Sequence, residues 1–158
     1  MSIDELRGLG LLDGLDTEQL GELLTAADEM SFTPGTVLFR AGEPADVWWI
    51  LLEGGVELVR HVGQEDVVVG RMTTPGQWAG GFRAWDPEGV YMATGRTESP
   101  GRLLRVPAES LGEMARSWFP LGVHLIQGLM NTVRKVEATA RQREALVALG
   151  NPRRWTRP

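Results

Sequence analysis

The chain has 158 residues, with 16 Lys and Arg against 21 Asp and Glu, and it contains no cysteine. This length favours one domain around a single core, and the lack of cysteine excludes disulfides and thiolate metal sites. Up to residue 133 there are 9 basic and 19 acidic side chains, which makes this part a poor nucleic-acid binder. No apolar run approaches the roughly 20 residues of a membrane span, and the acidic start is unlike a signal peptide, so we expect a cytoplasmic chain.

The first predicted element is a helix that begins after Asp16. Asp16 can cap the first turn and Gln19 can complete a capping box, with Leu15 packed against Leu20. Leu20 and Leu23 then recur at helical spacing, so one side of this helix is expected to pack on the rest of the domain.

Short β-like runs separated by glycine follow the helix. Many short strands with frequent turn signals are typical of a sandwich or a barrel. Trp48 and Trp49 adjoin in one of these runs, so one of them must point inward and the other outward. The expected strands are Thr36–Arg40, Val47–Leu52, Val56–Arg60, Val67–Met72, a stretch near Val90–Thr97, and Arg102–Val106.

Helix is expected again after Val106, with Pro107 in a first turn, and a second helix is expected from about Pro120 to Leu149. Some 30 residues make a rod of about 45 Å, longer than the domain that it leaves. Such a helix needs a second surface, which predicts a homodimer through it, although Gly128, Thr139 and Arg143 interrupt the heptad seam. Gly150-Asn151-Pro152 is expected to end the helix.

Residues 32–58, FTPGTVLFRAGEPADVWWILLEGGVEL, carry a specific pattern of glycines and apolar residues. This pattern resembles the front half of cyclic-nucleotide-binding domains, such as those of the catabolite activator and the regulatory subunits of protein kinase A. The resemblance covers about residues 10–135 and implies an α+β, mainly β fold, a jelly-roll-like double-stranded β-helix barrel with N-terminal helices and a long C-terminal helix. The expected division is a barrel over 1–120, a signalling and dimerisation helix over 121–150, and a tail over 151–158.

In the family that the chain resembles, a glycine-glutamate pair opens a short helix whose backbone N–H groups face the cyclic phosphate, and a following arginine pairs with that phosphate. Here Gly80 matches the glycine, but Gly81 stands where the glutamate belongs. The arginine position falls at about Val90 or Tyr91, so both charged recognition groups are missing. Binding of cyclic AMP in the family's manner is therefore expected to be weak or absent.

Aromatic side chains and two other cations surround this segment, which leaves three readings open. The pocket takes a different ligand, such as a planar heterocycle; or it is collapsed and filled by its own aromatics; or it binds a conventional cyclic nucleotide after all. The predicted ligand-binding residues are Trp78, Gly80, Gly81, Phe82, Arg83, Tyr91, Met92, Ala93, Thr94 and Arg96.

The sequence predicts no enzyme, no cofactor and no metal site, because His61 and His124 lack partners at ligand spacing and no nucleophile motif is present. We expect a regulatory ligand-sensing module of a signal-transduction protein. Residues 141–150 also resemble the linker helix of histidine kinases, so the chain could be the input domain of such a kinase. The alternatives are a ligand-free dimerisation scaffold and a catabolite-activator-like transcription regulator lacking its DNA-binding part.

Overall fold

The computed structural model describes residues 1–150, apart from the side chains of residues 133, 136, 137 and 139–150. The predicted tail over 151–158 therefore lies outside the described residues. The side chains of the dimer-seam positions Thr139 and Arg143 lie outside the described part of the chain as well. The chain divides into two compact units, one formed by Met1–Gly122 and one that begins at Val123.

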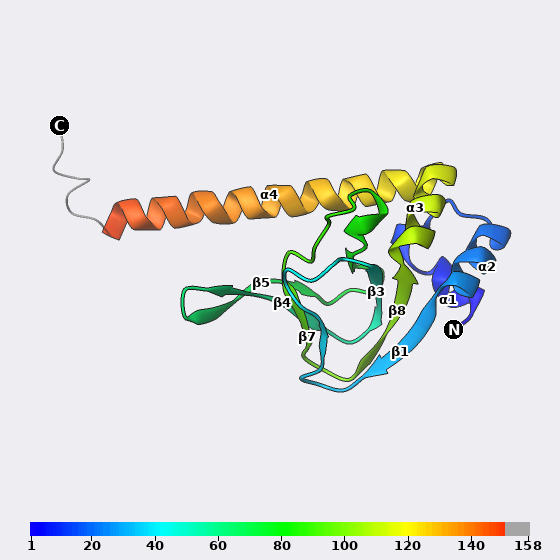
Figure 1. Ribbon diagram of the computed structural model, residues 1–158, viewed down its shortest axis with the longest axis horizontal. Coiled ribbons are helices and arrows are strands. Elements are labelled where there is room, and N and C mark those ends of the chain that lie inside the picture. The colour runs from blue at the N-terminus through cyan, green and yellow to red at the C-terminus, as the bar shows by residue number, and fades with distance from the viewer. Residues whose placement is uncertain (151–158) are drawn as a thin grey trace. The chain divides into compact units, whose positions relative to one another are not determined.

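Eight strands form two four-stranded antiparallel sheets (Figure 1). The strand order is β1-β8-β3-β6 in sheet A and β2-β7-β4-β5 in sheet B. This arrangement confirms the predicted mainly β, jelly-roll-like fold. The strands are β1 (Asp28–Phe32), β2 (Val37–Phe39), β3 (Val47–Glu53), β4 (Val56–Val62), β5 (Glu65–Met72), β6 (Trp78–Gly80), β7 (Thr94–Thr97) and β8 (Gly101–Pro107).

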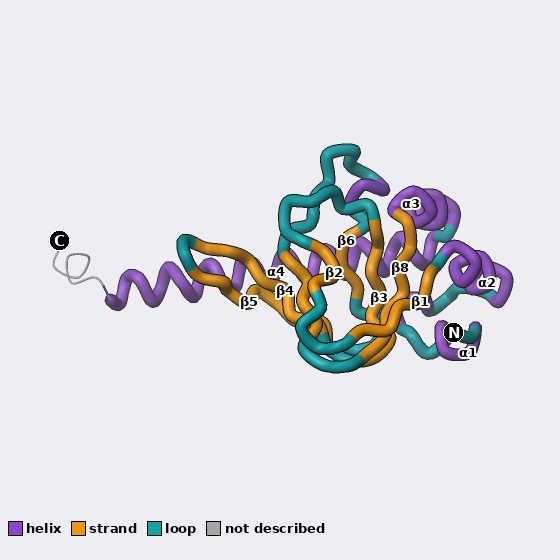
Figure 2. The backbone as a smooth tube through the Cα atoms, turned by 60° about the horizontal axis from the view of Figure 1, so that its bottom comes forward, coloured by secondary structure: helices purple, strands orange, loops and turns teal. Residues whose placement is uncertain are grey.

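The helices gather beside β1 and β8 of sheet A, as the tube view shows for α1, α2 and α3 (Figure 2). The capping box at Asp16 and Gln19 is present as the sequence predicts. The long helix begins at Phe119, one residue before the expected start. The helical elements are α1 (Ile3–Arg7), η1 (Gly10–Leu12), α2 (Thr17–Ala26), η2 (Phe82–Ala84), α3 (Ala108–Ser117) and α4 (Phe119–Gly150).

Successive side chains of β3 and β8 point to opposite faces of sheet A. Trp48 is fully buried on the face that the helices cover, while Trp49 points between the sheets. This confirms that adjacent tryptophans point to opposite sides, and it shows that the outward one packs under a helix.

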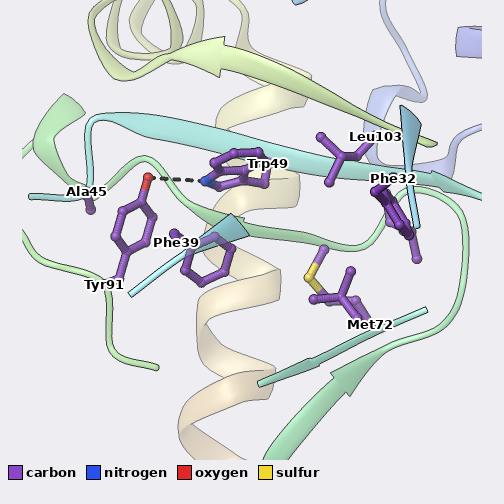
Figure 3. Packing of buried hydrophobic residues seen from close by; sticks show 9 residues of the cluster. Phe32, Phe39, Ala45, Trp49, Met72, Tyr91 and Leu103 are labelled. Carbon is purple, nitrogen blue, oxygen red and sulfur yellow. Dashed lines mark hydrogen bonds between the residues drawn. The ribbon is translucent and has the colours of Figure 1, made fainter. Parts of the chain in front are cut away.

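Side chains from both sheets fill the interior between them (Figure 3). Leu51 and Leu103 come from sheet A and meet Val56 and Met72 from sheet B, and all four are at most 5% exposed. The close packing of such apolar groups is the main source of the domain's stability. The core cluster consists of Phe32, Phe39, Ala45, Trp49, Leu51, Val56, Met72, Tyr91 and Leu103.

The sequence analysis missed two short strands and began a third too early. The run 28–32 forms β1 although it has little alternation, because it pairs with β8 over its whole length. Residues 78–80 form β6 against β3, which a three-residue run does not reveal. The stretch near Val90–Thr97 is a strand only over Thr94–Thr97, and Val90 makes an isolated bridge with Pro44.

Candidate functional site

The segment that corresponds to the family's phosphate-binding element begins at the end of β6. Gly80 and Gly81 both take left-handed backbone angles, with φ of +78° and +74°, and lead into the three-residue turn η2. This element therefore has the expected place in the fold. It contains only a single short turn instead of a longer helix.

A side chain at Gly81 would require its neighbours to move. A Cβ atom there would come within 2.7 Å of Leu111 Cδ2 in α3 and 3.0 Å of Trp48 Cβ. The glutamate that the family places at this position would therefore point into the contact between sheet A and α3. A glycine at this position is thus matched by the local packing.

Tyr91 lies inside the domain and is 6% exposed. Its ring stacks on Phe39 with 4.5 Å between ring centroids, and its hydroxyl accepts a hydrogen bond of 3.1 Å from Trp49 Nε1 (Figure 3). The same hydroxyl donates to the backbone oxygen of Val47 at 3.2 Å. Burial raises the pKa of Tyr91 above its ordinary value of 10.0, so the phenol is neutral at physiological pH.

The close approach of Gly80 completes this arrangement. A Cβ atom on Gly80 would come within 2.6 Å of Tyr91 Cε1 and 2.5 Å of the backbone oxygen of Val47. Phe82 packs against the same core cluster from η2. Among the predicted site residues, the structure brings Gly80, Phe82 and Tyr91 together.

The residues after Tyr91 lead back into sheet B. Met92 is 64% exposed, whereas Ala93 is buried. The hydroxyl of Thr94 accepts a hydrogen bond of 3.0 Å from the backbone N–H of Ala41, so it holds the neighbouring loop.

Arg83 lies on the other side of η2, in the wall of a surface pocket of about 490 Å³ between η2 and the start of α3. Its Nη1 donates to Asp46 Oδ1 at 3.1 Å. Glu109 and Arg116 also line this pocket, so its charged groups are balanced in sign. The pocket is separate from the core cluster in which Tyr91 lies.

Arg96 points away from the interior. A Cβ atom on its neighbour Gly95 would contact the Phe39 ring, so Gly95 faces inward and Arg96 faces the outer side of sheet B. There Arg96 Nε donates to Glu57 Oε1 at 2.7 Å. Arg83 and Arg96 therefore do not meet at one place.

Trp78 also lies outside the interior group. It contacts the buried Trp48 edge to face, with ring centroids 6.3 Å apart, on the helix-covered side of sheet A. Two aromatic residues that do line the interior, Phe39 and Trp49, were absent from the predicted site. The alternation of the strand 47–53 was the signal that could have placed Trp49 there.

This arrangement offers stacking faces and one neutral phenol, without a converging set of acid, base and nucleophile. Among the residues that the structure describes, no cluster of three or more His, Asp or Glu side chains could hold a metal ion. Within the same part of the chain, no helix has the length and apolar character to cross a membrane. Fold and site together define a mainly β domain of the jelly-roll type with a packed aromatic interior.

A family model described as the cyclic nucleotide-binding domain matches residues 29–117. The chain therefore belongs to the cyclic nucleotide-binding domain family. A crystal structure of a Geobacter metallireducens GS-15 protein assigned to cyclic nucleotide binding is 29% identical, with a TM-score of 0.65; the match covers 84% of this chain and 96% of that one.

Two further solved structures share the fold. The sensor domain of the transcriptional regulator DNR from Pseudomonas aeruginosa is 24% identical with a TM-score of 0.68, and the match covers 82% of this chain and 91% of that one. The catabolite activator protein of Thermus thermophilus is 21% identical with a TM-score of 0.71, over 85% of this chain and 62% of that one. These matched proteins are regulatory rather than catalytic.

Proposed function

We propose that the chain is a regulatory, non-catalytic module of a signalling protein whose interior is closed to cyclic nucleotide bound in the family's manner. The observation that carries this proposal is the position of Tyr91, whose ring stacks on Phe39 and whose hydroxyl bonds Trp49 and the backbone of Val47. The family's phosphate-binding arginine is expected at about Val90 or Tyr91 of this chain.

The free energy needed to move Tyr91 out of the interior favours the closed arrangement. Moving Tyr91 out would break its hydrogen bonds and leave the buried Trp49 indole N–H without its partner, at a cost of about 1–3 kcal/mol. A cyclic phosphate would then lie beside the rings of Phe39 and Trp49, without an arginine at the place where the family has it. The predicted set of ligand-binding residues, including Arg83 and Arg96, therefore remains a proposal for a ligand of another kind.

Signal transmission is assigned to the long helix. In this proposal a change in the β-rich part over 1–120 alters the joint near Phe119 and Pro120, and the helix over 121–150 carries that change onward. Ile126, Leu129 and Met130 are all exposed on α4 and have spacings of three and four residues, which suits a homodimer seam. The histidine-kinase likeness of residues 141–150 concerns side chains outside the described part of the chain.

The proposal is tested by isothermal titration and thermal shift of the full chain with cyclic AMP and cyclic GMP. A ligand at 100 times its dissociation constant stabilises a protein by about 2.7 kcal/mol, so specific binding is readily seen. We expect no response to either nucleotide. A clear midpoint rise with one of them, unchanged at matched ionic strength, would refute a closed interior.

Adding uncharged planar heterocycles to the same screen separates the two remaining readings. A response to one of them supports a sensor with a non-standard ligand, in which Tyr91 moves aside. Silence across the panel supports a ligand-free dimerisation scaffold.

The proposed dimer is tested by sedimentation of a variant with Ile126→Asp and Met130→Asp. Its matched control carries Gln127→Asp and Asn131→Asp, which place the same charges at neighbouring exposed positions. We expect the first pair alone to yield monomers. Equal association of both variants would contradict a seam on this side of the helix.

A further inference from the structure

Four residues form a row across sheet A. The register pairs Asp28 in β1 with Arg105 in β8, Arg105 with Trp49 in β3, and Trp49 with Ala79 in β6. Residues paired directly across strands share one side of a sheet. Trp49 belongs to the core cluster, so the whole row, Arg105 included, stands on the inner face of sheet A.

Arg105 has no partner among the residues that the structure describes, although it is only partly exposed. Its Nε is buried and makes no hydrogen bond. Asp28 lies directly opposite in the sheet, yet in the described part of the chain no carboxylate oxygen comes within 4.0 Å of this guanidinium. Five other arginines do pair with carboxylates, namely Arg7, Arg71, Arg83, Arg96 and Arg102.

An unpaired cation with a buried donor is costly. Withdrawing a guanidinium N–H from water without a partner costs more than leaving a neutral group unpaired, and buried charges in proteins are normally paired. Partial burial of the aliphatic stem, opposite Trp49 in the register, accounts for the side chain being held in place. It does not explain why a charged, fork-shaped group stands there with its Nε unsatisfied.

We propose that Arg105 is the anion-recognition residue of this domain and that it binds a small oxyanion, a phosphate or a carboxylate, on the inner face of sheet A. This rests on the proposed function, in which Tyr91 closes the interior to a cyclic nucleotide bound in the family's manner. The guanidinium presents parallel donors that match two oxygens of such an anion. Asp28 is exposed, and Ala79 and Arg105 are partly exposed.

The charge of Asp28 narrows the class of ligand. A carboxylate directly opposite Arg105 repels a second negative group on the same ligand. A compact oxyanion is therefore favoured over an extended polyanion such as nucleic acid.

The test uses thermal unfolding of the full chain, Arg105→Met and a matched control, Arg60→Met, which removes an exposed arginine of β4. The probes are inorganic phosphate and acetate, each compared with sodium chloride at equal ionic strength. We expect the parent and R60M to rise by about 5 °C or more with the preferred anion at saturation, and R105M to stay unchanged. In chloride, R105M is expected to be at least as stable as the parent, because it lacks the unpaired charge.

Phosphate and acetate distinguish the two oxyanion types. Arg105→Lys provides a second variant that retains the charge and most of the stem, and its response is expected to be weaker than that of the parent. A parent chain that ignores both anions would overturn the inference. So would an R105M variant that responds as the parent does, or one that loses several degrees in chloride, since Arg105 would then be a packing residue.

Titration of the parent and of R105M with cyclic AMP, beside the two anions, tests the role of Arg105 and the closed interior separately. Tight binding of cyclic AMP by both the parent and R105M would contradict the closed interior and also the role of Arg105. A response to phosphate that R105M lacks, together with silence towards cyclic AMP, supports both. Silence towards every anion refutes only the role of Arg105.

Discussion

Replacing Gly81 by alanine measures how tightly the segment of β6 and η2 is packed against α3. The left-handed φ of +74° alone costs an alanine about 1–2 kcal/mol. The new methyl group would also stand 2.7 Å from Leu111 Cδ2 and 3.0 Å from Trp48 Cβ, and such overpacking adds about 1–3 kcal/mol. We therefore expect the free energy of unfolding to fall by about 2–5 kcal/mol in total.

Gly35→Ala is the matched control. Gly35 has a φ of +82°, and a Cβ atom there would meet nothing within 4 Å, so only the backbone cost of about 1–2 kcal/mol applies. The assay is urea unfolding followed by circular dichroism, with the midpoints compared at a constant slope. Equal losses in the two variants would refute the close approach at Gly81. Confirmation would also mean that Gly81→Glu restores the family residue only by separating α3 from sheet A.

Three further substitutions test how much individual hydrogen bonds contribute to the stability of the domain. Tyr91→Phe leaves the buried Trp49 indole N–H unpaired, so urea unfolding should show a loss of about 1–3 kcal/mol; an unchanged midpoint would mean that the hydroxyl is dispensable. Thr97→Val removes a hydroxyl that bonds two backbone groups of the β1–β2 turn, and the same assay should show a loss of about 2 kcal/mol, whereas no loss would contradict those bonds. The hydrogen bond from Arg102 lowers the pKa of Glu29 below its ordinary 4.5, so this stabilisation is present above pH 4.5 and is lost as the pH falls through the lowered value. In Arg102→Ala, the urea midpoint should fall less than in the parent as the pH is lowered below 4.5. The same pH profile in both proteins would show that the pair of Arg102 and Glu29 contributes nothing to stability.

The sequence was informative wherever a local rule decides the structure. The capping residues of α2, the strands with strong alternation and the glycine pattern of residues 32–58 led to the jelly-roll fold and to the family. The sequence also led to the expectation that Gly81 stands where the family has a glutamate, and this stays a prediction.

The direction of each side chain in the site was less predictable. Arg96 and Trp78 lie close in sequence to Gly80 and Tyr91, yet strand alternation and a left-handed glycine pair send them to other faces. Arg105 was not singled out at all, because its inward position follows only from the register of β8 against β3. Register joins residues more than 50 positions apart, and neither composition nor local spacing reports on it.

Tyr91 is the single tyrosine among the 158 residues of the chain. A sample made with fluorinated tyrosine therefore contains one fluorine nucleus, and it stands in the interior against Phe39. The chemical shift of that nucleus depends on the stacked ring and on the hydroxyl's partners. One resonance per molecule thus reports whether the interior is shut or opened, in solution and without mutation, for every compound that is added.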